Sequence, residues 1–471
     1  MFAILVFAVI IRILYLVEVH NDVLLHITVR YDVFDECHFI KLAAQIIHGN
    51  WFGLTTGYNI CYPYLISLLY LFLPKDITTI FIFQIILGVI AVYVSYKTAV
   101  LLFDNKIAGL IAAFIVALYS PFIFNECDIE RGAVIAYSNL FCFYLLLKAF
   151  KTDKLKYFFY SGLMMGFSLV IRPNILPVFV APYIFFAVKR SSKAKICSVS
   201  AFLLGVVILA APFAFRNMIL GQGFNIEPQG LKSFWDGNAH DSPGIGYAVL
   251  KSESELTKES GNDIGKAFVI LSREIKKYPE EYMGLYSRKI KMFLCGYEVP
   301  SNLNYYLFKE RYAVLNAGFF NFAIVCPLAL TGIFLARRNI HFIGLFYIFL
   351  FVLSFSNILF HIQGRYRLPA VPFFIIMASY TICWLSDRAR KREWLLAGCA
   401  ILAIVGTAFY TRPDYHLIKK YSGGVIRAID YRNLSHAYFQ KSTECGIDNE
   451  RKDYFLKESE IYLKKANDVA L

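Results

Sequence analysis

The chain has 471 residues, of which 58% are hydrophobic and only 17% charged, and its mean hydropathy is +0.53. A soluble domain carries about 25% charged residues and could not bury this much apolar surface, so the composition excludes a soluble protein. The net charge of +14 does not indicate a nucleic-acid partner, because many Lys and Arg residues lie in short turns between apolar runs, where they act as topology signals.

Apolar runs that could form membrane-spanning helices recur along the chain. A spanning helix needs about 20 apolar residues, and about eleven runs are candidates. The first run has no basic n-region and no small-x-small cleavage site after it, so we expect an anchor, in which Arg12 has a structural role. The sequence therefore predicts an all-α polytopic membrane protein. The candidate runs lie near residues 2–18, 78–103, 107–124, 132–150, 157–171, 174–188, 196–215, 314–335, 340–360, 368–385 and 394–411.

Basic residues in the turns between these runs predict how the helices are oriented. Lys and Arg gather in alternate turns, and turns of this kind lie on the cytoplasmic side of membrane proteins. We therefore expect the N-terminus inside and the C-terminus outside, in the cytoplasmic membrane if the protein is bacterial. The basic turns contain Lys97 and Lys106; Lys148, Lys151, Lys154 and Lys156; Lys189, Arg190, Lys193 and Lys195; Arg337 and Arg338; and Arg388, Arg390, Lys391 and Arg392.

This orientation divides the chain into parts with different expected roles. Two short turns, 125–131 and 361–367, face the outer side together with the longer polar segments, so the concentrated polar chemistry is expected there. The parts are an N-terminal transmembrane catalytic module (1–215) with a first outer loop (19–77), an extracytoplasmic loop (216–313), C-terminal transmembrane helices (314–411) and an extracytoplasmic helical tail (412–471).

The first outer loop contains a segment with helical periodicity from Asp35 to Gly49. Apolar residues recur at i, i+3, i+4, i+7 and i+8, and Gly49 is a stop signal. The segment is too short and too polar to span, so we expect it to lie in the membrane interface with its apolar stripe in lipid. A second interfacial segment is predicted from Tyr62 to Leu73. The apolar stripe of the first segment, from Asp35 to Gly49, consists of Phe39, Leu42, Ala43, Ile46 and Ile47.

Two acidic residues, Asp35 and Glu36, begin this predicted helix. Carboxylates in that position stabilise a helix as an N-cap and through the helix dipole. A carboxylate held at the membrane surface is also suited to act as a general base. The two roles are compatible, because a cap keeps the carboxylate still.

Several motifs resemble one group of membrane enzymes. Residues Asp35–Ala43 (DECHFIKLA) resemble the first-loop signature DE-x-HF-x-K-x-A of protein O-mannosyltransferases. The order of the motifs over residues 31–385 is similar to that of the protein O-mannosyltransferase and aminoarabinose transferase group, which has the GT-C architecture. The second outer loop departs from the mannosyltransferase pattern, so the resemblance does not extend to mannose specificity. The other motifs are Pro121–Arg131, Arg172–Asn174, Arg216–Asn217, Trp235–Asn238, Tyr297–Tyr306 and Arg365–Pro369.

The resemblance implies an inverting glycosyltransferase that moves a sugar from a polyprenyl-phosphate donor to an acceptor hydroxyl. An outward-facing site would lack nucleotide sugars, which are made in the cytoplasm, whereas a lipid-linked sugar can be flipped to it. Asp35 is the candidate base, and Glu36 shapes the same pocket. Arginines suit the lipid phosphate, both in binding and as it leaves. The candidate substrate-binding residues are Arg131, Arg172, Arg216, Arg365, Arg367, His38, Lys41, Asp128 and Glu130.

Each candidate also has a simpler interpretation. An arginine at the end of a span usually extends to lipid headgroups, and Arg131 and Arg365 are the best candidates for exceptions. Asp128 and Glu130 are interpreted as solvated turn acids, with second catalytic carboxylates as the alternative. His38 without further ligands at metal-binding spacing is weak evidence for a metal, so we expect neither a metal nor another cofactor.

The long outer loop and the tail have open roles. Residues 216–313 include a charged helical stretch from about 253 to 293, and this loop is too long for a passive turn. A lid that selects the acceptor and a solvated cap are equally compatible with it. The sequence pattern of the tail predicts two or three amphipathic helices, which either bind a partner or pack against the loop.

Other functions compete with sugar transfer. A transporter or flippase of lipid-linked sugars would use the same cationic site without making a bond, but no clear internal repeat is present. A polymerase or ligase of surface polysaccharide and a non-catalytic scaffold are further alternatives. The expected partners are a polyprenyl-phosphate-linked sugar, membrane lipids and an acceptor glycan, lipid or protein, with no nucleic acid.

Overall fold

The computed structural model describes residues 1–31, 34–52, 60–189, 191–226, 230–246, 250–261, 263–318, 320–336, 342–444 and 447–470. In these ranges the chain is helical, with two isolated bridges (Tyr119 with Phe320, and Ile245 with Ile362) and no strand. The predicted all-α fold class is confirmed. Arg190, Arg337 and Arg338, which contributed to the predicted orientation, lie outside the described residues.

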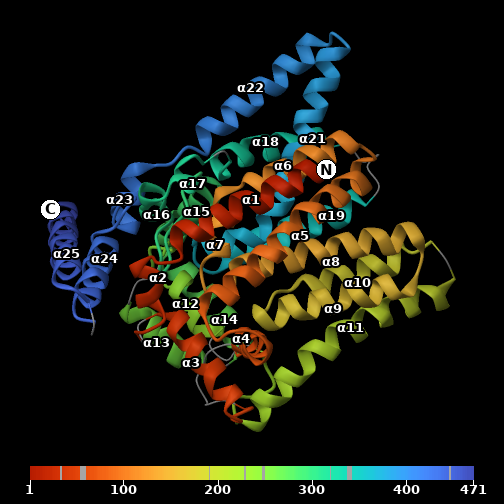
Figure 1. Cartoon of the computed structure of the whole chain (residues 1–471). Helices are drawn as coiled ribbons and strands as arrows, with labels where there is room; N and C mark the ends of the chain where they lie inside the picture. Colours follow the sequence, from red (N-terminus) through yellow and green to blue (C-terminus); the bar gives the residue numbers. More distant parts are fainter. Residues whose placement is uncertain are drawn as a thin grey trace.

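The N-terminal part contains both long apolar helices and shorter helices between them (Figure 1). In chain order they are α1 (Phe2–Val19), α2 (Val23–Thr28), α3 (Asp35–Ile47), α4 (Cys61–Phe72), α5 (Ile77–Phe103), α6 (Lys106–Leu118), α7 (Ser120–Glu126), α8 (Gly132–Thr152), α9 (Leu155–Ile171), α10 (Leu176–Ala187) and α11 (Ser192–Ile219).

The remaining helices form the long outer loop, a second apolar group and the tail. The predicted helical character of the loop and the tail is present in the structure. The helices are α12 (Gly230–Asn238), α13 (Lys251–Ser260), α14 (Ile264–Lys277), α15 (Pro279–Leu294), α16 (Tyr305–Arg311), α17 (Ala313–Asn316), α18 (Phe322–Leu335), α19 (Ile343–Leu359), α20 (Gly364–Arg367), the 3-10 helix η1 (Leu368–Ala370), α21 (Val371–Arg390), α22 (Trp394–Tyr410), α23 (Tyr415–Ser422), α24 (Ala428–Ser442) and α25 (Asn449–Ala470).

Six segments in the described part are long and apolar enough to cross a membrane, by length and composition. The other five predicted spans coincide with the shorter apolar helices α6, α9, α10, α18 and α19. The protein is therefore an integral membrane protein with several spans, and the number eleven stays a prediction. The six segments are Phe2–Val19, Ile77–Phe103, Gly132–Thr152, Ser192–Ile219, Gly364–Arg390 and Trp394–Ser422.

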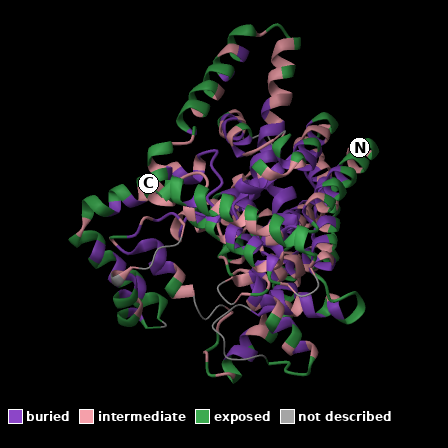
Figure 2. Cartoon of the chain, turned by 60° about the vertical axis from the view of Figure 1, so that its left-hand side comes forward, coloured by how far each residue is buried: buried purple, intermediate pink, exposed green. Residues whose placement is uncertain are grey.

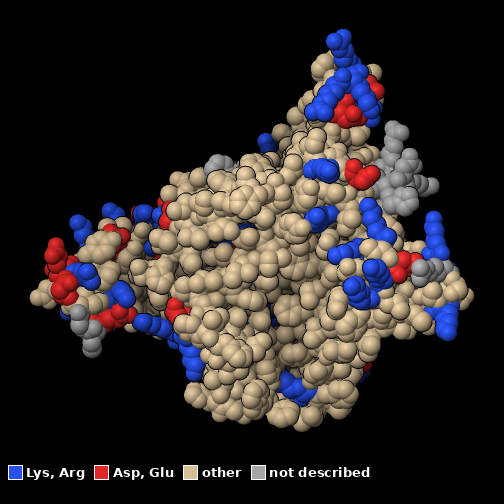
Figure 3. All heavy atoms as spheres, turned by 45° about the vertical axis from the view of Figure 1, so that its right-hand side comes forward, with Lys and Arg blue, Asp and Glu red and all other residues tan. Residues whose placement is uncertain are grey.

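The distribution of charge and burial agrees with a membrane location. On the face in Figure 3, a broad band without charged side chains separates the charged tail from charged side chains on the projecting hairpin and at the opposite edge. Figure 2 shows a buried centre, from which the α21–α22 hairpin projects. In the apolar stretch of Trp394–Ser422, only 17% of the residues are buried, whereas 72% of the residues are buried in the apolar stretch of α8. Apolar α22 therefore has an outward face suited to lipid.

The predicted span 107–124 is broken in the structure. Tyr119 has an extended backbone (ψ 99°) between α6 and α7, and its neighbour Ser120 donates its N–H to the carbonyl of Phe320 at 3.0 Å. Pro121 falls in the first turn of α7, where its missing N–H is not needed. The break turns the chain so that α7 leads into the acidic residues of the turn that follows it.

The apolar stripe of α3 is covered by protein. Phe39, Leu42, Ala43 and Ile46 are each at most 4% exposed. The Phe39 ring meets the Tyr62 ring of α4 edge to face, with centroids 5.3 Å apart. The expectation that this stripe lies in lipid is therefore wrong. The stripe packs on a second helix, because burying it in protein removes it from water just as effectively.

The segments that are predicted to face outward gather at one end of the molecule. In Figure 1, helices α2, α3, α12 and α13 lie toward the lower left and the tail helices α24 and α25 at the left edge, away from the turn between α21 and α22. Residues of α1 to α4, α7, α16, α24 and α25 share one hydrophobic cluster, whereas α12 to α15 form a smaller cluster of their own. The tail is thus packed against the first outer loop.

Candidate functional site

Four carboxylates from two distant segments meet beside α3. Asp35 and Glu36 lie in the first turn of α3, and Asp128 and Glu130 follow the end of α7. Phe34, not Asp35, is the N-cap residue, so the interpretation of Asp35 as an N-cap is wrong. Glu36, Asp128 and Glu130 are at most 4% exposed, so the interpretation of the two turn acids as solvated is also wrong. Asp35 keeps 27% of its side chain exposed and is the accessible member.

Arg365 joins carboxylates from both segments. Its Nη1 lies 3.3 Å from Asp35 Oδ2 and also contacts Glu130 Oε1, while its Nε donates to Gln363 Oε1 at 2.9 Å. The α20 turn that carries Arg365 directly precedes the predicted span at 368–385. The structure therefore places Arg365, one of the two best arginine candidates from the sequence, inside the acidic cluster.

Burial changes the acid–base properties of this cluster. It raises the pKa of Asp128 to about 7, although the neighbouring Arg365 charge acts in the opposite direction. Burial raises the pKa of Glu36 well above its usual range, and the negative charge of Asp128 raises it further. Desolvation favours the neutral form of a carboxyl group, and two nearby carboxylates cannot easily both ionise. The cluster therefore binds a proton more readily than separate, solvated carboxyl groups would.

Two further arginines lie at the same place. Arg131 Nη1 donates to the carbonyl of Ile171 at 3.2 Å, and its guanidinium lies 5.5 Å from the centroid of the Phe39 ring. Arg172 lies 3.5 Å from the centroid of the Tyr366 ring. The Arg365 guanidinium lies 5.2 Å from the centroid of the same ring. Guanidinium groups from two different helix ends thus lie against one phenol ring.

The other basic candidates lie elsewhere or face outward. Arg216 donates its Nε to the carbonyl of Phe52 at 2.7 Å and its Nη1 to Asn217 at 2.7 Å. Arg367 is 2% exposed, donates to the carbonyls of Phe293, Cys295 and Tyr297, and pairs with Glu298 at 2.7 Å. The structure therefore does not bring Arg216 and Arg367 to the acidic cluster.

His38 and Lys41 follow on α3, where His38 is half-buried and Lys41 is exposed. Neither side chain lines the pocket beside the cluster. Among the described residues, no three His, Cys, Asp or Glu side chains are grouped in a way that could hold a metal ion. The role of both residues in substrate binding stays a prediction.

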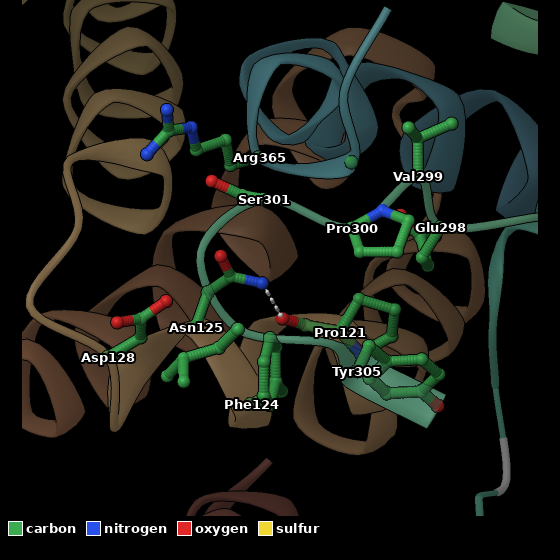
Figure 4. A pocket seen from close by; sticks show the side chains of 12 residues that line it. Pro121, Phe124, Asn125, Asp128, Glu298, Val299, Pro300, Ser301, Tyr305 and Arg365 are labelled. Atoms are coloured by element: carbon green, nitrogen blue, oxygen red, sulfur yellow. Dashed lines mark hydrogen bonds between the residues drawn. The ribbon is translucent and has the colours of Figure 1, made fainter. Parts of the chain in front are cut away.

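A pocket opens next to the acidic cluster (Figure 4). The empty space between its lining side chains, counted together with the open solvent at its mouth, is about 380 Å³. In the view of Figure 4, Arg365 and Asp128 lie on one side of the pocket and Glu298 and Pro300 on the other. Its lining comes from α7, the turn after α7, the segment 298–305 and the start of α20. The lining residues are Pro121, Phe124, Asn125, Asp128, Glu298, Val299, Pro300, Ser301, Leu303, Tyr305, Gly364 and Arg365.

A buried ion pair fixes the turn that carries Asp128. Arg12 Nε lies 2.7 Å from Glu126 Oε2, and both side chains are fully buried. Tyr137 donates its hydroxyl to the same carboxylate. Gln84 Nε2 donates to the carbonyls of Glu126 at 3.2 Å and Asp128 at 2.8 Å. Arg12 is therefore structural, as expected, and three helices hold the acidic turn in place.

Sequence reasoning missed several residues of this site. Glu298, Tyr305 and Asn302 occur in a segment that was singled out only as a motif, and Glu126 only as part of a turn. Asn302 Nδ2 donates to Glu36 Oε2 at 2.8 Å, although the two residues are 266 positions apart. A charged residue next to an otherwise apolar run, such as Glu126, is the one signal in the sequence that points to a buried partner.

Comparisons with known proteins agree with the predicted resemblance. Residues 59–215, about a third of the chain, match the family model described as dolichyl-phosphate-mannose-protein mannosyltransferase. No curated protein matches the chain significantly. The apo form of the oligosaccharyltransferase of Archaeoglobus fulgidus matches with a TM-score of 0.51 at 16% identity, covering 97% of this chain and 59% of the archaeal one.

The same archaeal enzyme in complex with an inhibitory peptide and a dolichol-phosphate matches with a TM-score of 0.47 at 15% identity, covering 97% of this chain and 59% of that one. The chain thus spans about three-fifths of the length of the oligosaccharyltransferase that it matches. At this identity the likeness shows the fold alone. The predicted resemblance to the GT-C glycosyltransferases is confirmed by the family model and by this shared fold.

Proposed function

We propose that the protein is an inverting glycosyltransferase that moves a sugar from a polyprenyl phosphate to an acceptor hydroxyl on the extracytoplasmic face of the membrane. The observation that carries the proposal is the meeting of Asp35, Asp128 and Arg365 beside one pocket, with Arg131 and Arg172 close by. The matching family model is described by a dolichyl-phosphate-mannose donor, which supports a lipid-phosphate donor here. The outward orientation rests on the basic turns in the sequence.

Asp35 is assigned the role of the base. It is the accessible carboxylate of the cluster, and Arg365 keeps it oriented. As the acceptor oxygen attacks the anomeric carbon, the bond from that carbon to the phosphate oxygen breaks and the acceptor proton passes to Asp35. Attack opposite the leaving phosphate inverts the anomeric centre. Glu36 and Asp128 form the wall behind the base.

The arginines are assigned to the phosphate. Arg172 and Arg365 lie against the Tyr366 ring, and the charge of Arg131 also acts on it, so a lipid phosphate bound there would meet more than one guanidinium group. A planar guanidinium forms paired hydrogen bonds with phosphate oxygens and stays charged in a low-dielectric site. Fixed positive charge next to the leaving group stabilises the negative charge that develops as the bond breaks.

The test is transfer by the purified protein in lipid vesicles. Polyprenyl-phosphate sugars with a labelled sugar are supplied together with candidate glycan, lipid and peptide acceptors, and products are identified by mass spectrometry. Covalent transfer supports the proposal. Movement of the labelled donor between leaflets without transfer would instead show a flippase, and the absence of both would refute the proposed function.

A further inference from the structure

The C-terminal tail is attached to the loop segment that borders the pocket. This segment, residues 297–304, runs between α15 and α16 and contributes Glu298 to Ser301 and Leu303 to the pocket wall. Tyr297 donates its hydroxyl to the carbonyl of Gly424 at 3.1 Å, at the start of the link between α23 and α24. The tail therefore contacts the site segment directly.

Helix α24 fixes the segment at two points on either side of Asn302. On one side, Arg427 Nη2 donates to the carbonyl of Ser301 at 2.9 Å. On the other side, Asn304 Nδ2 donates to Asp430 Oδ2 at 2.6 Å. Arg427 and Asp430 are themselves paired at 2.6 Å, and Asp430 is only 3% exposed. These contacts, which we call the tail latch, restrict the backbone on both sides of Asn302.

Asn302 connects the tail latch to the acidic cluster. Its side-chain amide donates to Glu36 Oε2 at 2.8 Å, and the same residue lines a small second cavity together with Asn304 and Asp430. One short run of chain thus touches the tail on one side and a carboxylate of the candidate site on the other.

We propose that Asn302 is a positioning residue that holds Glu36 beside Asp35, and that α24 keeps Asn302 in place through the tail latch. The tail then takes part in the reaction without contacting the substrate. The inference rests on the proposed function, and it assigns a role to a tail that lies outside the segment 59–215 matched by the family model.

The proposal has a consequence with a defined sign. An N–H that donates to a carboxylate stabilises its ionised form, so loss of the Asn302 amide raises the pKa of Glu36 further. The groups that face Glu36 are Asp35 on its own helix, Asp128 from the turn after α7 and Arg365 from α20, and Tyr62 of α4 lies nearby. None of these groups is altered by the substitution, so the expected direction is the one set by loss of the amide.

The first experiment compares Asn302→Ala with the wild-type protein. The rate of transfer from the polyprenyl-phosphate sugar that the wild-type protein uses is measured from pH 5 to 9, and so is the thermal unfolding temperature. In both pH profiles, we expect the midpoint of the change that reflects titration of Glu36 to move upward by about one pH unit. The free energy of one hydrogen bond to a charged group corresponds to a pKa shift of about this size. Profiles that superimpose on those of the wild type would overturn the role of Asn302.

The second experiment tests the tail. Asp430→Asn removes the charge that holds Arg427. The matched control is Asp414→Asn. Asp414 also caps a tail helix and pairs with a basic residue, Lys291, but it lies away from Asn302. We expect Asp430→Asn to shift the midpoint in the same direction as Asn302→Ala by a smaller amount, and Asp414→Asn to leave it unchanged. A shift with Asn302→Ala but not with Asp430→Asn would remove the tail from the proposal.

The two readouts separate this inference from the proposed function. If the wild-type protein transfers no sugar from any donor, the proposed function fails, but the unfolding profiles still report the link between Asn302 and Glu36. If transfer occurs and both profiles of the Asn302 and Asp430 variants match the wild type, the proposed function stands and the inference is wrong.

Discussion

At the scale of single residues, the candidate site depends on one guanidinium group that joins carboxylates from separate parts of the chain. Arg365 contacts Asp35 on α3 and Glu130 after α7, and it lies within the field of Glu36. Without Arg365, the buried acids would repel one another and would be neutral over a wider range of pH. The same residue therefore stabilises the cluster and keeps Asp35 oriented as a base.

The role of Asp35 predicts a specific loss of activity. Asp35→Asn keeps the shape of the side chain but removes its basicity, so we expect transfer to fall by roughly 100-fold or more, the usual contribution of a general base. The unfolding temperature should change little, because the side chain is partly exposed. The control is Glu259→Gln, an exposed carboxylate that also pairs with an arginine, at 2.6 Å from Arg273. Transfer at the wild-type rate by Asp35→Asn would refute the assignment.

The buried acid Asp128 predicts how stability depends on pH. Its pKa is about 7 in the folded protein, whereas an unfolded aspartate titrates near about 4. The folded state binds the Asp128 proton more tightly than the unfolded state does, and this stabilises the protein. The stabilisation is fully present below about pH 4 and is lost as the pH rises through 7, so the unfolding temperature should fall over that range of pH.

Asp128→Asn should remove much of this slope, leaving the part due to Glu36, whose pKa is also raised. Asp414→Asn is the control, because ion pairing with Lys291 lowers the pKa of Asp414 and keeps it ionised over the window. Calorimetry of both variants from pH 5 to 8 checks the prediction. An unchanged slope in Asp128→Asn would contradict the assignment of the proton.

At the scale of helices, α1, α5 and α8 hold the acidic turn by buried contacts. Arg12 on α1 and Tyr137 on α8 reach the Glu126 carboxylate, and Gln84 on α5 reaches the backbone beyond it. Breaking a buried ion pair by removing one partner costs about 3–5 kcal/mol, since it leaves an uncompensated charge. The position of Asp128 therefore depends on helices that do not line the pocket.

One glycine tests this dependence. Gly88 on α5 faces the ion pair, and a Cβ atom there would clash with the Glu126 carboxylate, lying 2.7 Å from Glu126 Cδ and 3.2 Å from Arg12 Nε. We expect Gly88→Ala to lower stability by about 1–3 kcal/mol through overpacking and to reduce transfer as the acidic turn shifts. Gly398→Ala in α22 is the matched control, because a Cβ atom there meets open space. Thermal unfolding in detergent and the transfer assay measure both effects.

At the scale of the whole molecule, the outer segments and the spans form one body around the pocket. The pocket wall includes residues from α7, the segment 298–305 and α20, which are far apart in the sequence. The division into 1–215, 216–313, 314–411 and 412–471 remains a proposal, and the site is built across the boundaries of that division. We therefore expect no isolated part to carry the activity.

The proposed orientation can be tested on intact cells. Lys457→Cys in the tail and Lys154→Cys in the turn after α8 place thiols at exposed positions on opposite predicted sides. A membrane-impermeant maleimide should label the first variant above the wild-type background and leave the second unlabelled until the cells are lysed. The reverse pattern would invert the topology and place the site in the cytoplasm.

Much of this architecture was predictable from local patterns. The apolar runs, the helix from Asp35 and the helical tail follow from periodicity, which is a property of neighbouring residues. The candidates Asp35, Glu36, Arg131, Arg172 and Arg365 come from motifs at helix ends, and the structure brings them together. The partners of Arg367 and Arg216 could not be predicted. In the sequence, an arginine that joins the acidic cluster and an arginine that binds backbone carbonyls elsewhere both lie next to the end of an apolar run.

By itself, the sequence determined that this is a membrane protein of helices with its polar chemistry at the helix ends, since hydropathy and charge act locally and need no partner. Only the tertiary structure decided that Asp128 and Glu130 are buried, that the α3 stripe packs on α4, and that Asn302 reaches Glu36. The physical reason is that burial and pKa depend on what surrounds a side chain, and the partners of Glu36 and Asp35, Asn302 and Arg365, lie more than 200 positions away in the sequence.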